Sequence, residues 1–380
     1  MSEIERLKLL TQQMHLEPAE DCPGTTLPER AKGALTVKKA LLPNGKSIRL
    51  LKTLLSSYCE RDCAYCPFRS QRDLPRAAFK PDEFAKLFDS LYRAGFVEGI
   101  FLSSSIFNGG VTTQDKLLDT ARILRQQLGF EGYLHLKIMP GAERAQVEEA
   151  LTLADRLSVN LEAPHPEALA FLAPHKDFKS ELLNPLQWIQ EIRVKDTPEK
   201  AWKGRWPSST TQFVVGAAGE SDLDILSTSV YLQETCRIAR AYYSSFNPYP
   251  DTPLENHRPS PPRRELRLYQ AFFLLRDYGF DLEELPYLQN NNLPLDTDPK
   301  RAWADENLLH HPLEINPAAR RELLRVPGIG PGRASRILTN RRQGKITSFS
   351  QLRKSRMISD RSAPYLLVNG RSPARQAALF

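Results

Sequence analysis

Short apolar runs alternate with longer amphipathic segments along the middle of the chain. The apolar runs have the length and composition of buried strands, and they fall at 48–55, 97–104, 132–139, 156–163, 211–217 and 242–247. The segments between them repeat apolar residues at three- and four-residue spacing, most clearly at 81–94 and also at 115–128, 143–155 and 222–241. Strands joined by single helices form a parallel sheet with right-handed crossovers. The pattern therefore predicts an α/β fold, a partial (β/α)6 TIM-like barrel over residues 45–257.

The pattern changes on both sides of this barrel. Residues 1–44 are punctuated by Pro and Gly and form an N-terminal extension, whereas the Pro- and Arg-rich stretch at 258–266 closes the barrel. A helical connector, with a helix near 263–279, is expected over 258–315, and a small all-helical module over 316–380. No apolar run approaches the ~20 residues that span a bilayer, and the N-terminus lacks a signal-peptide core. We expect a soluble, cytoplasmic protein without a membrane partner.

Positive charge is concentrated in the last segment. Residues 316–380 contain 14 Lys and Arg against 2 Asp and Glu, whereas residues 1–315 contain 38 against 43. Dense positive charge attracts the phosphates of a polyanion, so this asymmetry favours a nucleic-acid partner for the tail. A solvated basic surface without a partner is the equally simple alternative.

Three of the five cysteines lie within eight residues. The segment YCERDCAYCPF places Cys59, Cys63 and Cys66 at C-x3-C-x2-C spacing, directly after the first predicted barrel strand. That position is the C-terminal mouth of the barrel, where such folds carry their chemistry. Thiolates are the usual ligands of iron–sulfur clusters, and three of them leave one iron of a [4Fe-4S] cubane open.

Two other interpretations of these cysteines are less consistent with the sequence. A Cys3His zinc site needs a fourth ligand nearby, but the loop contains no histidine, and His15 and His135 are distant in sequence. Three clustered thiols also rarely serve packing alone. The remaining cysteines, Cys22 and Cys236, are isolated, and small-residue packing is the simpler role for each.

The cysteine loop resembles that of the radical S-adenosylmethionine (SAM) superfamily, which has this spacing and an aromatic residue where Tyr65 stands. The resemblance implies that Cys59, Cys63 and Cys66 bind a [4Fe-4S] cluster and act as the catalytic and metal-binding residues. It also implies that SAM binds the open iron, that backbone near Tyr65 meets the adenine, and that reductive cleavage gives a 5'-deoxyadenosyl radical. A flavodoxin- or ferredoxin-type electron donor is the partner expected from it.

Other cofactor contacts are predicted at the ends of later strands. The superfamily has a Gly-rich turn after its second strand; here SSSIFNGG offers Ser103, Ser105 and Asn108 instead, unless these residues cap the next helix. Asn160 and Glu162 share one face of the fourth strand, and a salt bridge at the strand end is the alternative role for Glu162. The segment FVVGAAGE is similar to a superfamily glycine pattern near adenine and adds Gly216 and Ala217.

Four aromatic residues stand near the end of the last predicted strand. Tyr242, Tyr243, Phe246 and Tyr249 either form a stacking wall for a base or fill the core, and core packing is the expected role for most of them.

The basic tail contains a second motif. Residues 320–344 read RRELLRVPGIGPGRASRILTNRRQG, in which a glycine-rich turn lies between two amphipathic helices instead of following a strand. It resembles a helix-hairpin-helix motif, which implies backbone contacts to phosphate near the start of the second helix. The nucleic-acid-binding residues predicted on this basis are Gly328, Gly330, Gly332, Arg333 and Arg336. A protein-interaction module of the same shape is the alternative.

Together, the barrel and tail resemble the putative DNA modification or repair radical SAM proteins. This resemblance implies an enzyme that generates a 5'-deoxyadenosyl radical and acts on DNA. An RNA- or tRNA-modifying enzyme and a non-catalytic iron–sulfur DNA-binding protein are the alternatives. The target atom, the product and the oligomeric state do not follow from the sequence.

Overall fold

The computed structural model describes residues 1–16, 35, 37–41 and 45–373, and the chain divides into two compact units. The first comprises residues 1–220 and 231–260, and the second comprises residues 221–230 and 261–380. Cys22 and most of the predicted N-terminal extension lie outside the described residues. Within the described ranges, no helix is long and apolar enough to cross a membrane.

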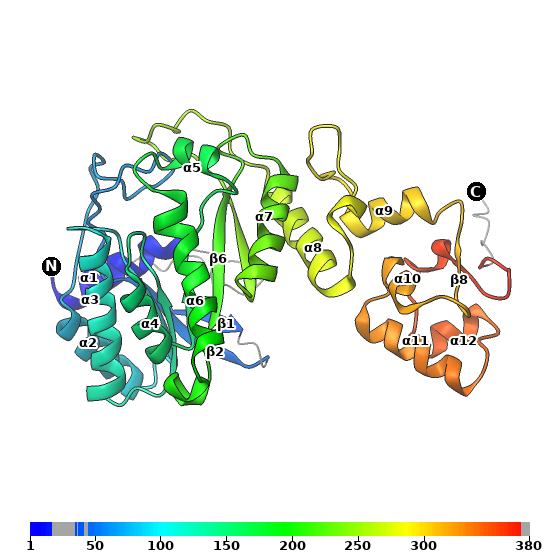
Figure 1. Ribbon diagram of the computed structural model, residues 1–380, viewed down its shortest axis with the longest axis horizontal. Helices are drawn as coiled ribbons and strands as arrows, with labels where there is room; N and C mark the ends of the chain where they lie inside the picture. The colour runs from blue at the N-terminus through cyan, green and yellow to red at the C-terminus, as the bar shows by residue number, and fades with distance from the viewer. Residues whose placement is uncertain (17–34, 36, 42–44, 374–380) are drawn as a thin grey trace. The chain divides into compact units, whose positions relative to one another are not determined.

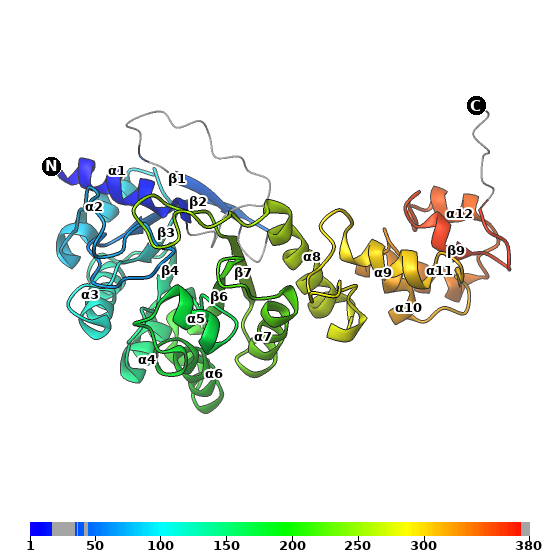
Figure 2. The same cartoon turned by 90° about the horizontal axis from the view of Figure 1, so that it is seen from above.

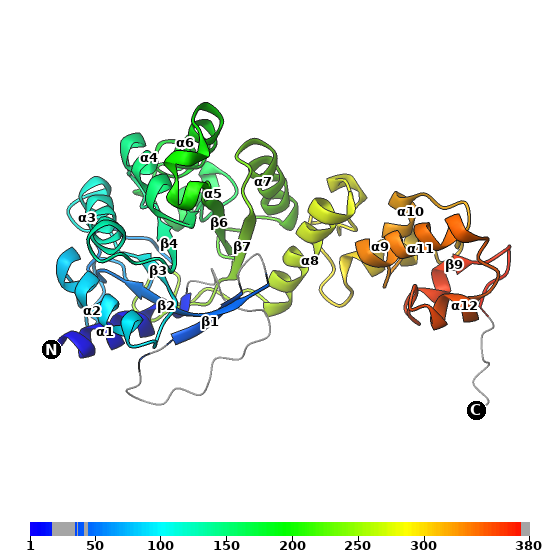
Figure 3. The same ribbon diagram turned by 90° about the horizontal axis from the view of Figure 1, so that it is seen from below.

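The first unit is built on a curled seven-stranded sheet in the order β1 to β7 (Figure 1). The strands are β1 (Val37–Leu41), β2 (Ser47–Leu54), β3 (Gly99–Ser103), β4 (Tyr133–Lys137), β5 (Arg156–Ser158), β6 (Ser208–Val215) and β7 (Arg240–Ser245). Strands β2 to β7 are parallel, and β1 pairs antiparallel with β2 along one edge (Figure 3). The partial barrel predicted from the alternating pattern is confirmed, and each of its six predicted strands is present.

Helices pack around the outer face of this sheet (Figure 2). Those that belong wholly to the first unit are α1 (Glu3–Gln12), α2 (Pro81–Arg93), α3 (Gly110–Arg122), α4 (Arg144–Leu153), α5 (Pro166–Leu172) and α6 (Asn184–Lys195), and α7 (Asp222–Thr235) is divided between the two units. Helix α2 shows why the pattern was predictive: it begins with Pro81 at a permitted first-turn position and buries Phe84 and Phe88. Phe88 meets Phe130 edge to face at 5.1 Å. Burial of such apolar faces leaves the strand ends free to carry polar chemistry.

The second unit is mainly helical. It contains α8 (Pro262–Tyr278), α9 (Pro299–Asn307), α10 (Arg320–Arg325), α11 (Pro331–Gln343) and α12 (Phe349–Lys354). The module is not entirely helical as expected, because β8 (Leu313–Glu314) and β9 (Leu366–Leu367) form a short parallel ladder. The predicted connector and the predicted basic module both fall within this unit.

One core joins α10 and α11 to the segment that follows them. The buried residues Leu323, Ile329, Ala334 and Ile337 recur 29 positions later as Leu352, Ile358, Ala363 and Leu366, all of them also buried. The turn before α11 packs closely on the later segment, since a Cβ at Gly328 would collide with the Ser359 Oγ. Gly328 also has a φ of +79°, which favours glycine. The turn therefore requires glycine for both space and backbone conformation.

Candidate active site

A cavity opens at the C-terminal ends of the parallel strands. It encloses about 1180 Å³ counted to its open mouth, and Leu54, Ser103 and Val214 mark the ends of three strands on its wall. The predicted residues that line it are Cys59, Cys63, Tyr65, Cys66, Ser103, Ser105, Asn160 and Glu162. Side chains that are distant in sequence are therefore gathered in one place, at the barrel end that carries chemistry in such folds.

The cysteine loop follows β2 and is held by backbone hydrogen bonds. Ala64 N–H donates to the Leu172 carbonyl at 2.7 Å, and Cys66 N–H donates to the Cys63 carbonyl at 3.2 Å. Arg76 donates to four backbone carbonyls around the loop, among them those of Ser57 and Phe68. The loop has a defined path because its own backbone groups are satisfied by these neighbours.

Two of the three thiols, Cys63 and Cys66, lie in a poorly solvated environment. Burial raises the pKa of Cys63 and of Cys66, so neither thiol ionises readily in the protein alone. A metal cation reverses this preference, because a coordinated thiol is deprotonated outright. The donor set of three thiols on one cavity wall thus fits a cluster with one open iron, and each thiolate would bind a different iron. Within the described part of the chain, no three His, Cys, Asp or Glu residues converge to hold a single metal ion.

Glu162 forms a buried ion pair next to this loop. Its Oε1 lies 3.2 Å from Lys176 Nζ, and the two side chains are only 8% and 7% exposed. Burial opposes the charged form of Lys176, but the attraction of Glu162, and of Cys63 in its thiolate form, outweighs it, so the pKa of Lys176 lies above its ordinary value. Tyr65 bonds to Glu162 as well, and burial together with that carboxylate raises the pKa of its hydroxyl. Glu162 therefore lines the cavity, as predicted for a cofactor contact, and it also forms the salt bridge that was the alternative prediction for this residue.

The segment after α5 is tied to the cysteine loop at several points. Arg61 donates to the His175 carbonyl and pairs with Glu181 at 2.6 Å, while Asp62 lies 2.8 Å from the His175 ring. These contacts, with the Ala64–Leu172 bond and the Lys176 ion pair, fix residues 172–181 against the thiol loop. Lys176 did not emerge from the sequence, because it lies in an irregular segment without a motif.

The serine-rich turn after β3 contributes its backbone and short side chains. Ser103 and Ser105 line the cavity, whereas Asn108 is exposed and is not among its lining residues. None of them caps α3, whose N-cap is Gly109 without a side-chain bond. The Thr113 hydroxyl donates to the Gly109 carbonyl at 2.8 Å and braces the turn.

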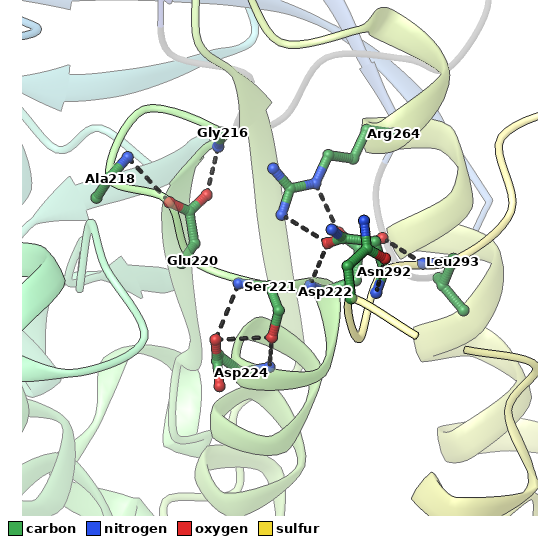
Figure 4. Close-up of polar contacts among 10 residues, drawn as sticks. Gly216, Ala218, Glu220, Ser221, Asp222, Asp224, Arg264, Asn292 and Leu293 are labelled. Carbon is green, nitrogen blue, oxygen red and sulfur yellow. Dashed lines mark hydrogen bonds and ion pairs between the residues drawn. The ribbon is translucent and has the colours of Figure 1, made fainter. Parts of the chain in front are cut away.

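The turn after β6 is organised around one carboxylate (Figure 4). Glu220 accepts hydrogen bonds from the backbone N–H groups of Gly216 and Ala218. Gly216 has a φ of +92°, which explains the glycine there. Gly216 and Ala217 are not among the cavity-lining residues.

The next residues start α7 (Figure 4). Asp222 is fully buried, pairs with Arg264 at 2.7 Å, and accepts the Leu293 N–H at 2.8 Å. A buried carboxylate with these partners has a structural role, and it fixes the start of α7 within the second unit.

The aromatic residues of β7 and of the segment after it divide between the two predicted roles. Tyr243 is fully buried and stacks with Phe213 at 6.1 Å, as a core residue does. Phe246 and Tyr249 line the cavity instead. Cys236 is buried away from the cavity wall, which agrees with a packing role.

The predicted nucleic-acid contacts lie around α10 and α11. Gly330 is the N-cap of α11, and Gly332 is exposed in its first turn. Arg333 donates to the Gly328 carbonyl and so supports the turn, whereas Arg336 is exposed. Lys300 of α9, which the sequence did not single out, donates to the Ile329 carbonyl within the same turn.

Several solved structures are similar to part of this chain. Among solved structures, the chain is similar to the hydrogenase maturase HydG from Carboxydothermus hydrogenoformans, with 15% identity, 60% of this chain and 51% of that chain covered, and a TM-score of 0.46. It is also similar to methylornithine synthase (PylB), with 15% identity, 60% of this chain and 61% of that chain covered, and a TM-score of 0.46. Coproporphyrinogen III oxidase (HemN) from Escherichia coli is similar with 12% identity, 60% of this chain and 52% of that chain covered, and a TM-score of 0.38. The chain thus spans about half to three fifths of the length of these proteins.

The family comparison is more direct. No curated protein matches the chain. The family model described as the radical SAM superfamily matches residues 53–228, a range that includes the thiol loop, Glu162, Lys176 and the turn after β6. Over these residues, this chain contains a radical SAM superfamily domain.

Proposed function

We propose that this protein is a radical SAM enzyme that acts on nucleic acid, with DNA as its substrate. The observation that carries the proposal is the opening of Cys59, Cys63 and Cys66 into one cavity at the C-terminal mouth of the barrel. When bound there, the cluster supplies the electron that cleaves SAM to methionine and a 5'-deoxyadenosyl radical. A flavodoxin- or ferredoxin-type protein is the proposed electron donor.

The chain's own residues bind the reactants and exclude water. The three cysteines hold the cluster, and Lys176 places a positive charge beside their thiolates. Ser103, Ser105, Asn160 and Glu162 offer polar groups to SAM from the ends of β3 and from the segment after β5. A buried site of this kind protects a radical from solvent while orienting the hydrogen that it abstracts.

The basic second unit supports a nucleic-acid substrate. The start of α11 presents backbone N–H groups and the positive end of the helix dipole, both of which favour phosphate. The exposed residues Arg336, Arg342 and Lys345 lie on α11 and just beyond it. Such contacts go to the sugar–phosphate backbone and carry no base sequence, so binding is expected at many sequences.

Production of 5'-deoxyadenosine tests the catalytic part of the proposal. The protein is reconstituted anaerobically with iron and sulfide, reduced with dithionite and supplied with SAM. We expect methionine and 5'-deoxyadenosine in equal amounts, because one cleavage gives both. A reconstituted, reduced protein that forms neither product is a non-catalytic iron–sulfur protein, and the proposed activity is then wrong.

Charge removal on α11 tests the nucleic-acid part. The variant R336Q/R342Q/K345Q is expected to bind duplex DNA more weakly at every sequence, and the slope of log K against log salt should fall by roughly 0.9 for each phosphate that the variant no longer neutralises. Fluorescence anisotropy over a salt series measures both effects. The matched control K195Q removes an exposed positive charge from α6 and should leave DNA binding unchanged.

Two results would redirect this part of the proposal. Binding that does not depend on salt contradicts phosphate contacts and favours a protein partner for the module. Tighter binding of tRNA than of duplex DNA in the same titration favours the RNA-modifying alternative.

A further inference from the structure

The cavity-facing side of β5 and β6 bears a row of uncharged polar residues. Gln212 lines the cavity, and Thr210, two residues earlier on β6, faces the same side of the sheet. Ser158 of β5 pairs in register with Thr210, and on its other side with Lys137, which also lines the cavity. Ser158, Thr210 and Gln212, here called the polar strip, therefore lie together on the inner face of the sheet. Gln212 lines the cavity, and Ser158 and Thr210 lie one step deeper in the barrel, outside the cavity lining.

The polar strip contains hydrogen-bonding atoms without protein partners. The side chains are 3%, 0% and 6% exposed, yet Ser158 Oγ, Thr210 Oγ1 and Gln212 Oε1 have no hydrogen-bond partner among the described residues. Leaving a buried polar atom unpaired is costly, and native structures usually satisfy such groups with a ligand or an ordered water. Three such atoms on adjacent strand positions indicate a site that is completed by a bound molecule.

The chemistry of the polar strip selects a neutral, planar ligand. A carboxamide and two hydroxyls both donate and accept hydrogen bonds, and none of them compensates a buried charge. Among the charged residues of the wall, Glu162 and Lys176 pair at 3.2 Å and Arg61 pairs with Glu181 at 2.6 Å. Lys137 also lines the wall, in register with Ser158. Phe246 and Tyr249 add aromatic surface to the same cavity. Carboxamides reading a base edge, with aromatic side chains against its faces, are the usual means of recognising a nucleobase.

The polar strip and the residues predicted for SAM lie at different depths of the barrel. The residues predicted for SAM come mainly from the cysteine loop and from the ends of β3 and the segment after β5. The polar strip lies earlier along its strands than Glu162 and Val214, and so deeper in the barrel.

We infer that the polar strip binds a nucleobase of the substrate, turned out of its strand and inserted into the barrel. This inference rests on the proposed function and names the part of the nucleic acid that reaches the radical. The Gln212 carboxamide reads the base edge, and the hydroxyls of Ser158 and Thr210 complete its hydrogen bonds. The adenine of SAM is also a neutral, planar base with a hydrogen-bonding edge, so the test must distinguish a base of the substrate from the adenine of the cofactor.

Binding of free deoxynucleosides tests the inference. Deoxynucleosides carry no phosphate, so contacts made by the basic second unit do not contribute. Calorimetric titration of the cluster-loaded, SAM-bound protein with deoxyadenosine, deoxyguanosine, deoxycytidine and thymidine should show one preferred base. Gln212→Met, similar in length but without the amide, should weaken that binding at least about fivefold, the lower end of a bidentate base contact. Thr210→Val should act in the same direction.

The affinity for SAM provides the internal comparison. The affinity for SAM should stay within about twofold in Gln212→Met if the polar strip serves the substrate. The control Ser209→Ala removes a hydroxyl from the opposite face of β6, where it already accepts a hydrogen bond from Arg193 at 3.1 Å. This control should change neither the affinity for SAM nor that for the deoxynucleoside, and it reports any general loss of packing in β6.

Three outcomes overturn the inference. A parallel loss of SAM affinity in Gln212→Met assigns the polar strip to the cofactor. If the wild-type protein forms 5'-deoxyadenosine but binds no deoxynucleoside, ordered water and not a base satisfies the polar strip. The proposed radical chemistry is unaffected by that result. Equal nucleoside binding by wild type and Gln212→Met places the base elsewhere in the cavity. Failure of wild type to form 5'-deoxyadenosine instead counts against the proposed function.

Discussion

Replacing Cys63 with Ala is expected to abolish assembly of the iron–sulfur cluster and to reduce 5'-deoxyadenosine formation to background. Cys63 lies in the middle of the thiol loop and is 6% exposed on the cavity wall. Each thiolate would bind a different iron of the cluster, so the two remaining ligands would not hold a cubane against loss of iron. Iron and sulfide analysis, together with the visible absorption of the reconstituted protein, measures the first effect.

The chain offers a matched control for this substitution. Cys236 is buried to 1% exposure, hydrogen bonds with Thr235, and does not line the cavity. Cys236→Ala should therefore retain the iron, the sulfide and the activity, although it removes an equally buried thiol. Full iron and sulfide content in Cys63→Ala would contradict the assignment of the loop as the cluster ligand set.

The regular part of the fold was predictable because it follows from local patterns. Buried parallel strands are apolar on both faces, and their helices repeat apolar residues with a period near 3.6, as Phe84 and Phe88 do in α2. Strand β1 was not predicted, because five residues with mixed burial leave too short a pattern. Its stability comes from pairing with β2, which is a long-range contact.

The site was predictable only where its residues form a local motif. The thiol loop was recognised because its three ligands lie within eight positions, and the serines after β3 because they follow a strand directly. Lys176 was missed because its link to Glu162 depends on how residues 172–181 fold back on the loop. Gln212 had a signal that could have been used, since it is a polar residue within the buried run TTQFVVG.

The buried ion pair beside the thiol loop gives the second large expected effect. Lys176→Met leaves the Glu162 carboxylate without its ammonium partner at a site that is 8% exposed. Breaking a buried pair by removing one partner costs about 3–5 kcal/mol, because the remaining charge stays desolvated. We expect a loss of this size in the free energy of unfolding of the cluster-free protein, measured with urea under reducing, anaerobic conditions.

A double substitution separates the ion pair from simple packing. In Lys176→Met/Glu162→Gln no charge remains buried, so much of the stability should return and the two effects should be strongly non-additive. Lys200→Met breaks an exposed pair with Asp196 and should change stability little, because water already screens those charges. If Lys176→Met is no more destabilising than Lys200→Met, or if the double variant merely adds two losses, the ion pair does not stabilise the loop. Its contribution would then be confined to binding at the cavity.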